Sequence, residues 1–337
     1  MSAPDVLVTG SAGHLGCAFM LSLPSLGHTP IGIDIRPSET TTHVGCITNR
    51  PFIAALFTQY PTIKHILHAA TLHKPHVGSH AKSDFVNVNI AGTLVLLEES
   101  AKLGPQIDSF VFISTTSTFG KALSPREASP AAWIDESVVP VPKNIYGVTK
   151  VAAEDLCRLV QAQTGMPVLV LRTSRFFPEA DDDEDRRSSM ADENLKVLEL
   201  AYRRVDIADV VSACVCAMQR ARHIGWGRYI VSSPPPFRKE EGTLQRLNAS
   251  GKAGVVLQEV VPGIAEALGK KGWKFLQRFD RVYDSTKTVE ELGWRPTYTI
   301  QHAVGCILEG KEWRSDLTFK VGKKGYHNVP TGVYTVR

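Results

Sequence analysis

Long apolar runs, paired cysteines and stripes of basic residues are all missing from this sequence. No apolar stretch approaches the roughly 20 residues that span a bilayer, so we expect no membrane segment. The six cysteines include no Cys-x-x-Cys pair, and the 11 histidines show no metal-ligand spacing. His73 and His76 are the nearest candidates, but no carboxylate follows at a useful spacing. The sequence therefore predicts neither a disulfide framework nor a bound metal.

The excess of basic residues is small. A net charge of +4 without a lysine or arginine run does not indicate a nucleic-acid surface. Met-Ser-Ala-Pro leads directly into the strand-like segment 5–9, which leaves no room for a signal peptide. The scattered cysteines fit reduced thiols. We expect a soluble, cytoplasmic protein, and 337 residues with 43% hydrophobic content are enough for an ample core.

Short apolar runs alternate with amphipathic segments along most of the chain. The strand-like runs are Val6–Val8, Ile31–Ile35, His65–His68, Phe110–Ile113, Val168–Leu171 and Arg228–Val231. The helix-like segments lie near Leu15–Leu23, Pro51–Gln59, Asp84–Lys102, Ile145–Gln163 and Ile207–Arg222. Strands that are apolar throughout and alternate with helices are typical of a parallel sheet covered on both faces. We predict an α/β fold with a doubly wound parallel sheet of the Rossmann type.

Two regions interrupt the alternation. The charge run at 179–189 is open to two interpretations, a solvated loop or a lid over the active cleft. The Pro- and Gly-rich region Ser232–Asp280 predicts a cap outside the sheet. The expected divisions are a nucleotide-binding domain at 1–175 completed by about 204–232, a smaller substrate-binding lobe at 176–203 and 233–315, and a C-terminal tail at 316–337.

A glycine motif joins the first predicted strand to the first predicted helix. In Thr-Gly-Ser-Ala-Gly-His-Leu-Gly, residues 9–16, Gly10 permits a tight turn and Gly13 lets the backbone approach a pyrophosphate. Gly16 allows close packing of helix on strand, and the helix amino terminus adds amide donors. This context predicts a dinucleotide site. Its expected contact residues in this segment are Gly10, Gly13, His14, Leu15 and Gly16.

Asp34 ends the second strand-like run, 18 residues after Gly16. A carboxylate at this point accepts hydrogen bonds from the adenosine ribose hydroxyls and repels a 2′-phosphate, which favours NAD over NADP. Arg36, two residues later, is able to accommodate that phosphate. We assign both residues to the cofactor site.

The spacing Tyr-x-x-x-Lys occurs three times, but only Tyr146 and Lys150 open a long amphipathic segment. Lys150 lies one helical turn after Tyr146, where we expect it to lower the tyrosine pKa and hold the nicotinamide ribose. Thr115, at the end of a strand-like run, is expected to donate a hydrogen bond to the same substrate oxygen. The three residues predict hydride transfer at a secondary alcohol, with Tyr146 as acid and base.

Together these segments resemble the extended short-chain dehydrogenase/reductase family, in its NAD-dependent sugar epimerase/dehydratase group. The segments that carry the resemblance, in family order, are 9–16, Asp34, His68–Ala70, Asn89–Thr93, Ser114–Gly120, Tyr146–Lys150, Arg204–Val210 and Leu292–Pro296. The resemblance implies that the backbone of His68, Ala69 and Ala70 passes beside the cofactor. It also implies that Asn89 belongs to the cofactor site and positions the catalytic layout. Family members pair through a four-helix interface, which implies a homodimer.

Departures from the family pattern narrow the expected activity. Thr116-Ser117 follow Thr115 where 4,6-dehydratases carry Asp-Glu, so dehydration is not expected. The segment Gly45–Asn49 lacks the acidic residue that often contacts adenine, and Phe119 stands where a tyrosine is frequent. Arg175 stands where sugar-nucleotide epimerases carry an asparagine that binds the substrate diphosphate. It is either a ligand for a phosphate or carboxylate or a surface residue.

Basic residues near the predicted cleft indicate an anionic substrate, although each is also open to interpretation as a surface charge. The candidate substrate-binding residues are His73, Lys74, Arg175 and Arg204. We predict an NAD-dependent epimerase or oxidoreductase that acts on a sugar nucleotide or a similar polar metabolite. The alternative is a one-way NAD(P)-dependent dehydrogenase or ketoreductase on a small substrate, including secondary-metabolism intermediates. A non-catalytic dinucleotide sensor is disfavoured, because both Tyr146 and Lys150 are present.

Overall fold

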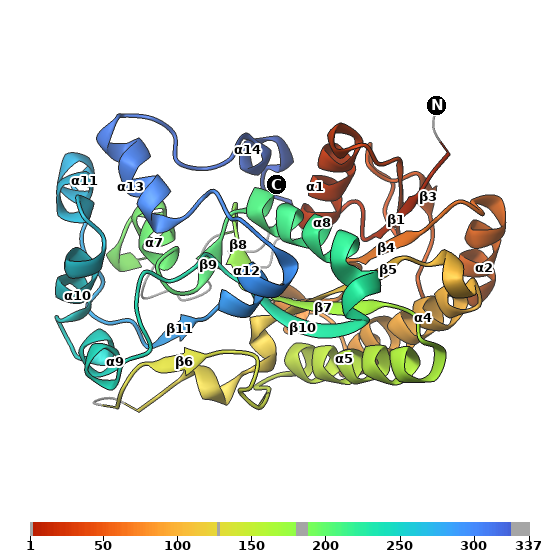
Figure 1. Cartoon of the computed structure of the whole chain (residues 1–337), viewed down its shortest axis with the longest axis horizontal. Coiled ribbons are helices and arrows are strands. Elements are labelled where there is room, and N and C mark those ends of the chain that lie inside the picture. Colours follow the sequence, from red (N-terminus) through yellow and green to blue (C-terminus); the bar gives the residue numbers. More distant parts are fainter. Residues whose placement is uncertain (1–2, 127–128, 180–187, 325–337) are drawn as a thin grey trace.

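The computed structural model describes residues 3–126, 129–179 and 188–324, and it is built around a seven-stranded parallel sheet (Figure 1). The strands are β1 (Val6–Thr9), β2 (Pro30–Asp34), β3 (His43–Val44), β4 (His65–His68), β5 (Ser109–Thr115), β7 (Val168–Thr173) and β10 (Trp226–Val231). Their order is β10-β7-β5-β4-β1-β2-β3. All six predicted strands are confirmed. Only β3 was not expected, because its two residues are too few to show a pattern.

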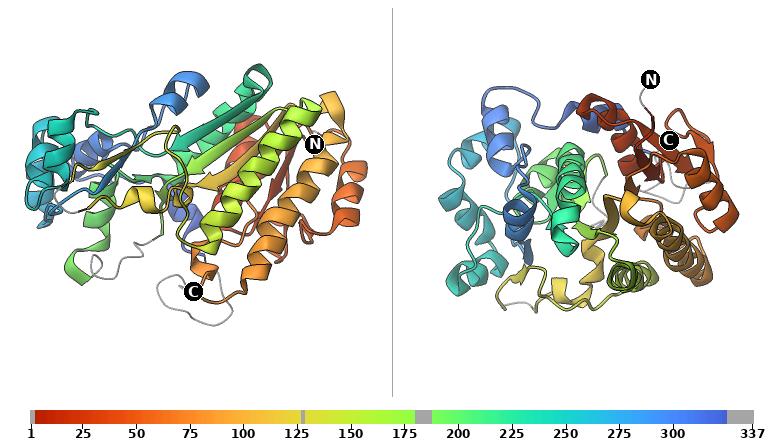
Figure 2. Two further views of the ribbon diagram at one scale, coloured as in Figure 1. Left: turned by 90° about the horizontal axis from the view of Figure 1, so that it is seen from below. Right: turned by 45° about the vertical axis from the view of Figure 1, so that its right-hand side comes forward.

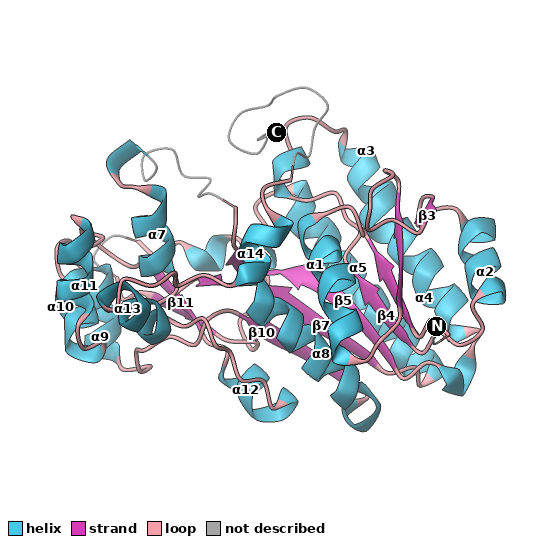
Figure 3. Cartoon of the chain, turned by 90° about the horizontal axis from the view of Figure 1, so that it is seen from above, coloured by secondary structure: helices cyan, strands magenta, loops and turns pink. Residues whose placement is uncertain are grey.

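Helices cover both faces of this sheet, as Figures 2 and 3 show. One face carries α1 (His14–Ser22), α8 (Ile207–Ile224), α12 (Thr286–Leu292) and α14 (Asp316–Val321). The other carries α2 (Arg50–Gln59), α4 (Thr93–Ala101) and α5 (Ile145–Thr164). The doubly wound arrangement is therefore confirmed. Single turns of 3₁₀ helix occur at η1 (Leu23–Leu26), η2 (Lys74–His76), η4 (Gly104–Gln106), η5 (Thr116–Thr118) and η6 (Lys121–Leu123).

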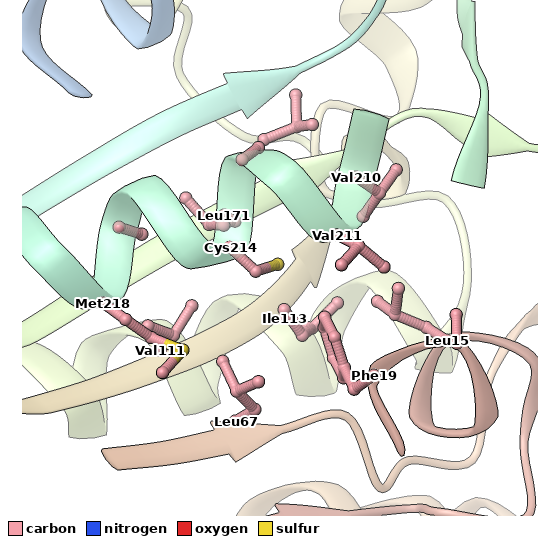
Figure 4. Close-up of a cluster of buried hydrophobic side chains, with 14 of the residues drawn as sticks. Leu15, Phe19, Leu67, Val111, Ile113, Leu171, Val210, Val211, Cys214 and Met218 are labelled. Atoms are coloured by element: carbon pink, nitrogen blue, oxygen red, sulfur yellow. The ribbon is translucent and has the colours of Figure 1, made fainter. Parts of the chain in front are cut away.

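The core between α1, α8 and the sheet follows from the spacing of apolar residues (Figure 4). Val210, Cys214 and Met218 recur every four residues, so they share one face of α8. They pack over strand residues such as Val111 and Leu171, which are fully buried. Burying an aliphatic side chain of this size contributes roughly 1.5–3 kcal/mol, so this layer holds α8 firmly against the sheet.

The predicted helix at 84–102 divides into three parts. A short α3 (Lys82–Phe85) leads into the π-helical segment η3 (Val86–Gly92), and α4 follows. The wider turn contains Asn89, whose side chain is bonded to neighbouring segments rather than exposed. Hydrophobic periodicity alone predicts a single helix here, because a turn with one extra residue changes the spacing of apolar residues too little to be recognised.

A second lobe is built around a separate hydrophobic cluster. Four short strands, β6 (Ala132–Ile134), β8 (Arg175–Phe176), β9 (Arg204–Val205) and β11 (Arg281–Tyr283), form the parallel pairs β11-β6 and β8-β9. The β8-β9 pair adjoins the first core, because Phe176 and Val205 pack with the residues of α1 and α8. The helices of the second lobe are α7 (Asp192–Glu199), α9 (Glu241–Asn248), α10 (Ala253–Val260), α11 (Ile264–Lys271) and α13 (Ile300–Leu308). The region 232–280 is thus a helical unit outside the central sheet, as expected of a cap.

Two segments that we expected in the lobe and the tail pack instead on the nucleotide-binding domain. Leu292 and the fully buried Trp294 belong to the core under α8. The Trp294 indole N–H donates to Asp209 O at 3.1 Å and to Ser212 Oγ at 2.9 Å. Val321 of α14 joins the same core. These residues thus join the core of the nucleotide-binding domain, although we placed them in the lobe at 233–315 and the tail at 316–337, because their apolar side chains are buried beside α8. The remainder of the predicted tail, 325–337, lies outside the described residues.

In the part of the chain that the structure describes, no helix combines the length and the hydropathy that a membrane span requires.

Candidate functional site

A cavity of about 480 Å³ opens at the carboxyl ends of the central strands. Its wall includes Gly10 after β1, Asp34 at the end of β2 and Ala69–Ala70 after β4. It continues to Thr115 at the end of β5 and to Tyr146 in α5. Parallel strands present their carboxyl ends at one edge of a sheet, so residues that are distant in sequence meet here.

The glycine motif leaves no room for side chains at the start of α1. Gly10 has a φ of +74°, and a Cβ there would lie 2.8 Å from Ala70 N. A Cβ on Gly16 would lie 2.0 Å from Gly10 O. Gly13 is the N-cap of α1, and among the described residues no side chain caps it, so the first helical amides remain available to an anion. This cradle fits the pyrophosphate of a dinucleotide.

Asp34, the last residue of β2, is held by hydrogen bonds from two main-chain amides. Its Oδ2 accepts from Ala12 N at 3.0 Å and its Oδ1 accepts from Arg36 N at 2.9 Å. Asp34 and Arg36 both line the cavity, beside Gly45–Ile47. A carboxylate held at this edge of the cavity is able to accept from ribose hydroxyls, so the predicted contact with NAD stays a prediction.

His68 lies behind the cavity wall rather than in it. Its ring is fully buried, with Nδ1 2.8 Å from Thr9 Oγ1 and Nε2 2.9 Å from Thr93 Oγ1. Burial, with a smaller contribution from Lys150, lowers the pKa of His68 to about 3, so the ring is neutral. A direct side-chain contact between His68 and the cofactor is therefore excluded by its position. The next two residues in the chain, Ala69 and Ala70, line the cavity instead.

Asn89, which we also assigned to the cofactor site, connects two segments behind the cavity. Its Oδ1 accepts from Leu72 N at 2.8 Å and from Thr71 Oγ1 at 2.9 Å. Its Nδ2 donates to Leu72 O at 2.8 Å and to Thr149 Oγ1 at 3.0 Å. Asn89 is 1% exposed and is not part of the cavity wall. It therefore holds the loop after β4 against the helix that carries Tyr146, which is a positioning role.

Thr115 and Tyr146 face the same cavity, and the Thr115 side chain is near enough to influence the pKa of the tyrosine. Asn144 begins α5 by accepting at Oδ1 from Gly147 N at 3.0 Å. A Cβ on Gly147 would lie only 3.0 Å from Ser117 O. The glycine thus lets the start of the helix approach the segment that follows Thr115, which brings the two hydroxyl groups together.

Tyr146 is a protonated phenol in this environment. Burial raises its pKa above the ordinary value, and the nearby Thr115 side chain opposes that rise. The nearby Glu179 carboxylate adds to the rise. We expected Lys150 to lower the pKa of Tyr146, but burial outweighs any such effect in this arrangement.

Lys150 is turned toward the sheet. Its Nζ donates to Ile113 O at 2.6 Å and lies 3.9 Å from the centroid of the Phe112 ring. It is 2% exposed and does not line the cavity. Burial lowers the pKa of Lys150 to about 7, while the neighbouring Cys157 and Glu154 act in the opposite direction.

A buried ion pair between Glu154 and Arg172, which we did not predict from the sequence, lies on the helix and strand next to the catalytic candidates. Glu154 of α5 accepts from Ser114 Oγ at 2.5 Å and from Arg172 Nη2 at 2.7 Å. The pair joins the helix of Tyr146 to β5 and β7. Its signals in the sequence are an arginine within an apolar strand run and a glutamate one helical turn after Lys150.

Three of the four predicted substrate residues, His73, Lys74 and Arg175, line the cavity, but Arg204 does not. Arg204 is fully buried, and its Nε lies 2.6 Å from Glu199 Oε2. A substrate contact by Arg204 is therefore wrong, because the side chain points into the second lobe's interior. The neighbouring Arg203, another basic residue expected near the substrate, does line the cavity. Three further lobe residues that we did not assign to the cavity also line it: Glu199, Arg281 and Tyr283.

His14 connects the glycine motif to two distant segments. Its Nε2 accepts from Lys324 N at 2.9 Å, and its Nδ1 lies 3.5 Å from a carboxylate oxygen of Glu179. Burial lowers the pKa of His14. The possible lid at 179–189 is described only at its ends, since 180–187 lie outside the described residues.

Comparison with known proteins agrees with this geometry. The model of the NAD-dependent epimerase/dehydratase family matches residues 6–231. A UDP-glucose 4-epimerase from Rhizobium meliloti is 31% identical over 196 residues, which cover 56% of this chain and 55% of that protein. The GDP-6-deoxy-D-mannose reductase of Pseudomonas aeruginosa is 26% identical over 243 residues, 68% of this chain and 73% of that protein. The chain spans about half the length of the curated UDP-glucose 4-epimerases that it matches.

Solved structures share the fold at low sequence identity. The UDP-glucose 4-epimerase of Thermotoga maritima, solved with UDP-glucose, has a TM-score of 0.60 at 19% identity, covering 90% of this chain and 97% of that one. The UDP-N-acetylglucosamine 4-epimerase of Bacillus cereus has a TM-score of 0.62 at 18% identity, with coverages of 90% and 98%.

Proposed function

Because the chain belongs to the NAD-dependent epimerase/dehydratase family, we propose that it is an NAD-dependent epimerase or oxidoreductase acting at a secondary alcohol or ketone. The observation that carries the proposal is the Thr115–Tyr146 hydroxyl pair, which faces the same cavity as the glycine cradle. Thr116-Ser117 follow Thr115 in place of an acidic pair, which favours this reaction over dehydration.

The cofactor of the family is NAD, and the cradle at Gly10–Gly16 and the carboxylate of Asp34 would hold it. When bound, NAD supplies the acceptor and donor of a hydride at the substrate carbon. The chain itself supplies the proton. Tyr146 Oη, a phenol that stays protonated at neutral pH and whose pKa burial raises further, donates to a carbonyl oxygen in one direction and takes the proton back in the other. Thr115 Oγ1 donates to the same oxygen and orients it.

A substrate with an anionic group, such as a sugar nucleotide, fits the second-lobe side of the cavity. Arg175, Arg203 and Arg281 line this side, with Arg203 paired to Glu199, and Lys74 of η2 lines the cavity as well. Arg281 carries an ion pair with Asp280, so it is held in place by a neighbour before any ligand arrives. Planar guanidinium groups bind phosphate and carboxylate in two-bond geometry, which supports this class of substrate.

The test has two parts. The first is mass spectrometry of dinucleotide released from protein purified without added cofactor. Near-stoichiometric NAD supports an epimerase that regenerates its cofactor, whereas an empty protein that exchanges NAD supports the one-way dehydrogenase or ketoreductase. The second is turnover on a panel of UDP- and GDP-sugars and of free alcohols and ketones.

Tyr146→Phe is expected to lower kcat by about 10²–10⁴-fold while leaving NAD binding intact, because it removes only the proton donor. Tyr60→Phe is the matched control, since Tyr60 has the same Tyr-x-x-x-Lys spacing but lies at the end of α2 and binds His43 Nε2 at 2.8 Å. Full turnover by the Tyr146 variant would refute the proposed acid and base.

We also propose that the chain forms a homodimer through α4 and α5. These helices pack side by side, and Val148 and Leu159 of α5 are about half exposed, at 50% and 49%. Exposed apolar residues on one helix face are typical of an interface. Leu159→Glu is expected to halve the mass in solution by light scattering, whereas Leu21→Glu, on α1, leaves it unchanged. A monomeric wild-type chain would exclude this dimer.

A further inference from the structure

Two histidines and an aspartate meet at the amino-terminal edge of the central sheet, at the opposite end of the strands from the cavity. Asp5 precedes β1, His28 precedes β2, and His65 begins β4. Val6 pairs in parallel register with both Pro30 and His65, so the three side chains start from neighbouring strands. One nitrogen of each imidazole and one carboxylate oxygen of Asp5 all lie within 4.8 Å of one another.

The main chain at this edge is fixed by the sheet. Asp5 N donates to Thr29 O at 3.1 Å, and Asp5 O accepts from Lys64 N at 2.9 Å and from His65 N at 3.1 Å. The carboxylate is oriented as well, because Asp5 Oδ1 accepts from Thr29 N at 2.7 Å. These bonds hold the cluster together without help from a ligand, so little conformational freedom remains to be lost when an ion binds.

The side chains are in forms that bind a cation. His65 Nδ1 lies 2.9 Å from Ser109 Oγ. In the tautomer in which Nδ1–H donates to that hydroxyl, Nε2 keeps a lone pair for a metal, an arrangement that ligand histidines commonly have. Asp5 Oδ2, 2.7 Å from His28 Nδ1, supplies negative charge beside the second imidazole.

We propose that Asp5, His28 and His65 form a zinc site that ties together the amino ends of β1, β2 and β4. Imidazole nitrogens with a carboxylate oxygen are zinc ligands, and they do not suit calcium or magnesium, which take oxygen ligands. Tetrahedral bonds of about 2.0–2.2 Å place ligand atoms roughly 3.3 Å apart. The widest separation in the cluster, at most 4.8 Å, therefore has to shorten by no more than about 1.5 Å, while the 2.7 Å between His28 Nδ1 and Asp5 Oδ2 has to lengthen. The side chains of His28 and Asp5 are 19% and 28% exposed, which leaves access for the ion and for a water as fourth ligand.

The experiment titrates ZnCl₂ into the EDTA-treated full-length protein by calorimetry and records Tm with and without zinc. The variants are His28→Gln and His65→Gln. The matched control is His43→Gln, because His43 begins β3 of the same sheet but binds Tyr60 Oη instead. Circular dichroism in EDTA shows whether each variant folds. His28 lies in the loop before β2, where a substitution disturbs the sheet less than one at His65. The variant His28→Gln therefore tests the proposal even if His65→Gln fails to fold.

The wild-type chain and His43→Gln are expected to bind one zinc ion and to gain roughly 5 °C in Tm at saturating zinc. His28→Gln and His65→Gln are expected to bind at least about tenfold more weakly and to lose the gain in Tm. The proposal is overturned if the wild-type chain binds no zinc. It is equally overturned if both variants keep wild-type affinity, because the zinc would then bind elsewhere, for example at the cavity histidines.

Discussion

Replacement of Glu154 by glutamine is expected to destabilise the protein far more than the small change in shape suggests. The carboxylate is fully buried, and it accepts from Ser114 Oγ and from Arg172 Nε and Nη2. Arg172 is 2% exposed, and its Nη1 has no hydrogen-bond partner among the residues that the structure describes. Arg228 contributes a weaker contact, with its Nε 3.3 Å from Glu154 Oε2. A neutral glutamine would leave the Arg172 guanidinium buried without a counter-charge.

The size of the effect follows from this environment. Removing one partner of a buried ion pair costs about 3–5 kcal/mol, because the remaining charge is desolvated without compensation. Ser114→Ala removes a single hydrogen bond to a charged group and is expected to cost about 1.5–3 kcal/mol. The double variant Glu154→Leu/Arg172→Met removes both charges together, so it is expected to lose less stability than Glu154→Gln alone.

Urea unfolding at neutral pH, followed by circular dichroism, measures these free energies. Glu98→Gln is the surface control, since Glu98 pairs with Arg50 and both side chains are 42% exposed. It is expected to change stability by less than about 1 kcal/mol. The reasoning is refuted if Glu154→Gln loses no more than this control, or if the double variant is less stable than the single one. Turnover should fall with Glu154→Gln, because the pair joins the helix of Tyr146 to β5.

Three further changes test the cofactor site and the buried lysine. Gly16→Ala is expected to weaken NADH binding at least about tenfold in fluorescence titrations, because its Cβ would meet Gly10 O at 2.0 Å. Gly242→Ala, where a Cβ meets nothing within 4 Å, should bind normally, and equal affinities would contradict the assignment of the cradle. Asp34→Asn should shift the ratio of the Kd values for NAD and NADP roughly tenfold toward NADP, since a neutral amide does not repel a 2′-phosphate; an unchanged ratio would argue against its ribose role. Lys150→Met should stabilise the cofactor-free protein near pH 7, because burial lowers the lysine pKa from 10.5 to about 7. Between these two pKa values the unfolded chain binds more protons than the folded chain. The destabilisation caused by burying the lysine is therefore complete below pH 7 and absent above pH 10.5. The difference in unfolding free energy between Lys150→Met and the wild-type chain, measured in urea, should therefore narrow as pH rises. A difference that is independent of pH would count against the effect of burial.

The sequence alone determined those features that depend on neighbouring residues in the chain. Apolar runs of strand length and amphipathic segments of helical period predicted all six long strands of the sheet and its main helices. The glycine motif was predictable because its three glycines act within one strand–helix joint. Tyr146 was separable from the other Tyr-x-x-x-Lys copies because only its segment has helical periodicity. Short elements such as β3 and the eight-residue helices of the second lobe were not predictable, since they contain too few turns to show a period.

Only the tertiary structure decided which side chains share a site. His68 and Arg204 belong to segments typical of the family, yet burial against their neighbours keeps their side chains out of the cavity. Arg281 enters the cavity wall from a strand more than a hundred residues after Tyr146. The cluster of Asp5 and His65 has no spacing that sequence analysis could find, because it depends on the order and register of parallel strands. Periodicity and motifs record interactions along the chain, whereas burial and convergence depend on how distant elements pack, and that is a property of the fold.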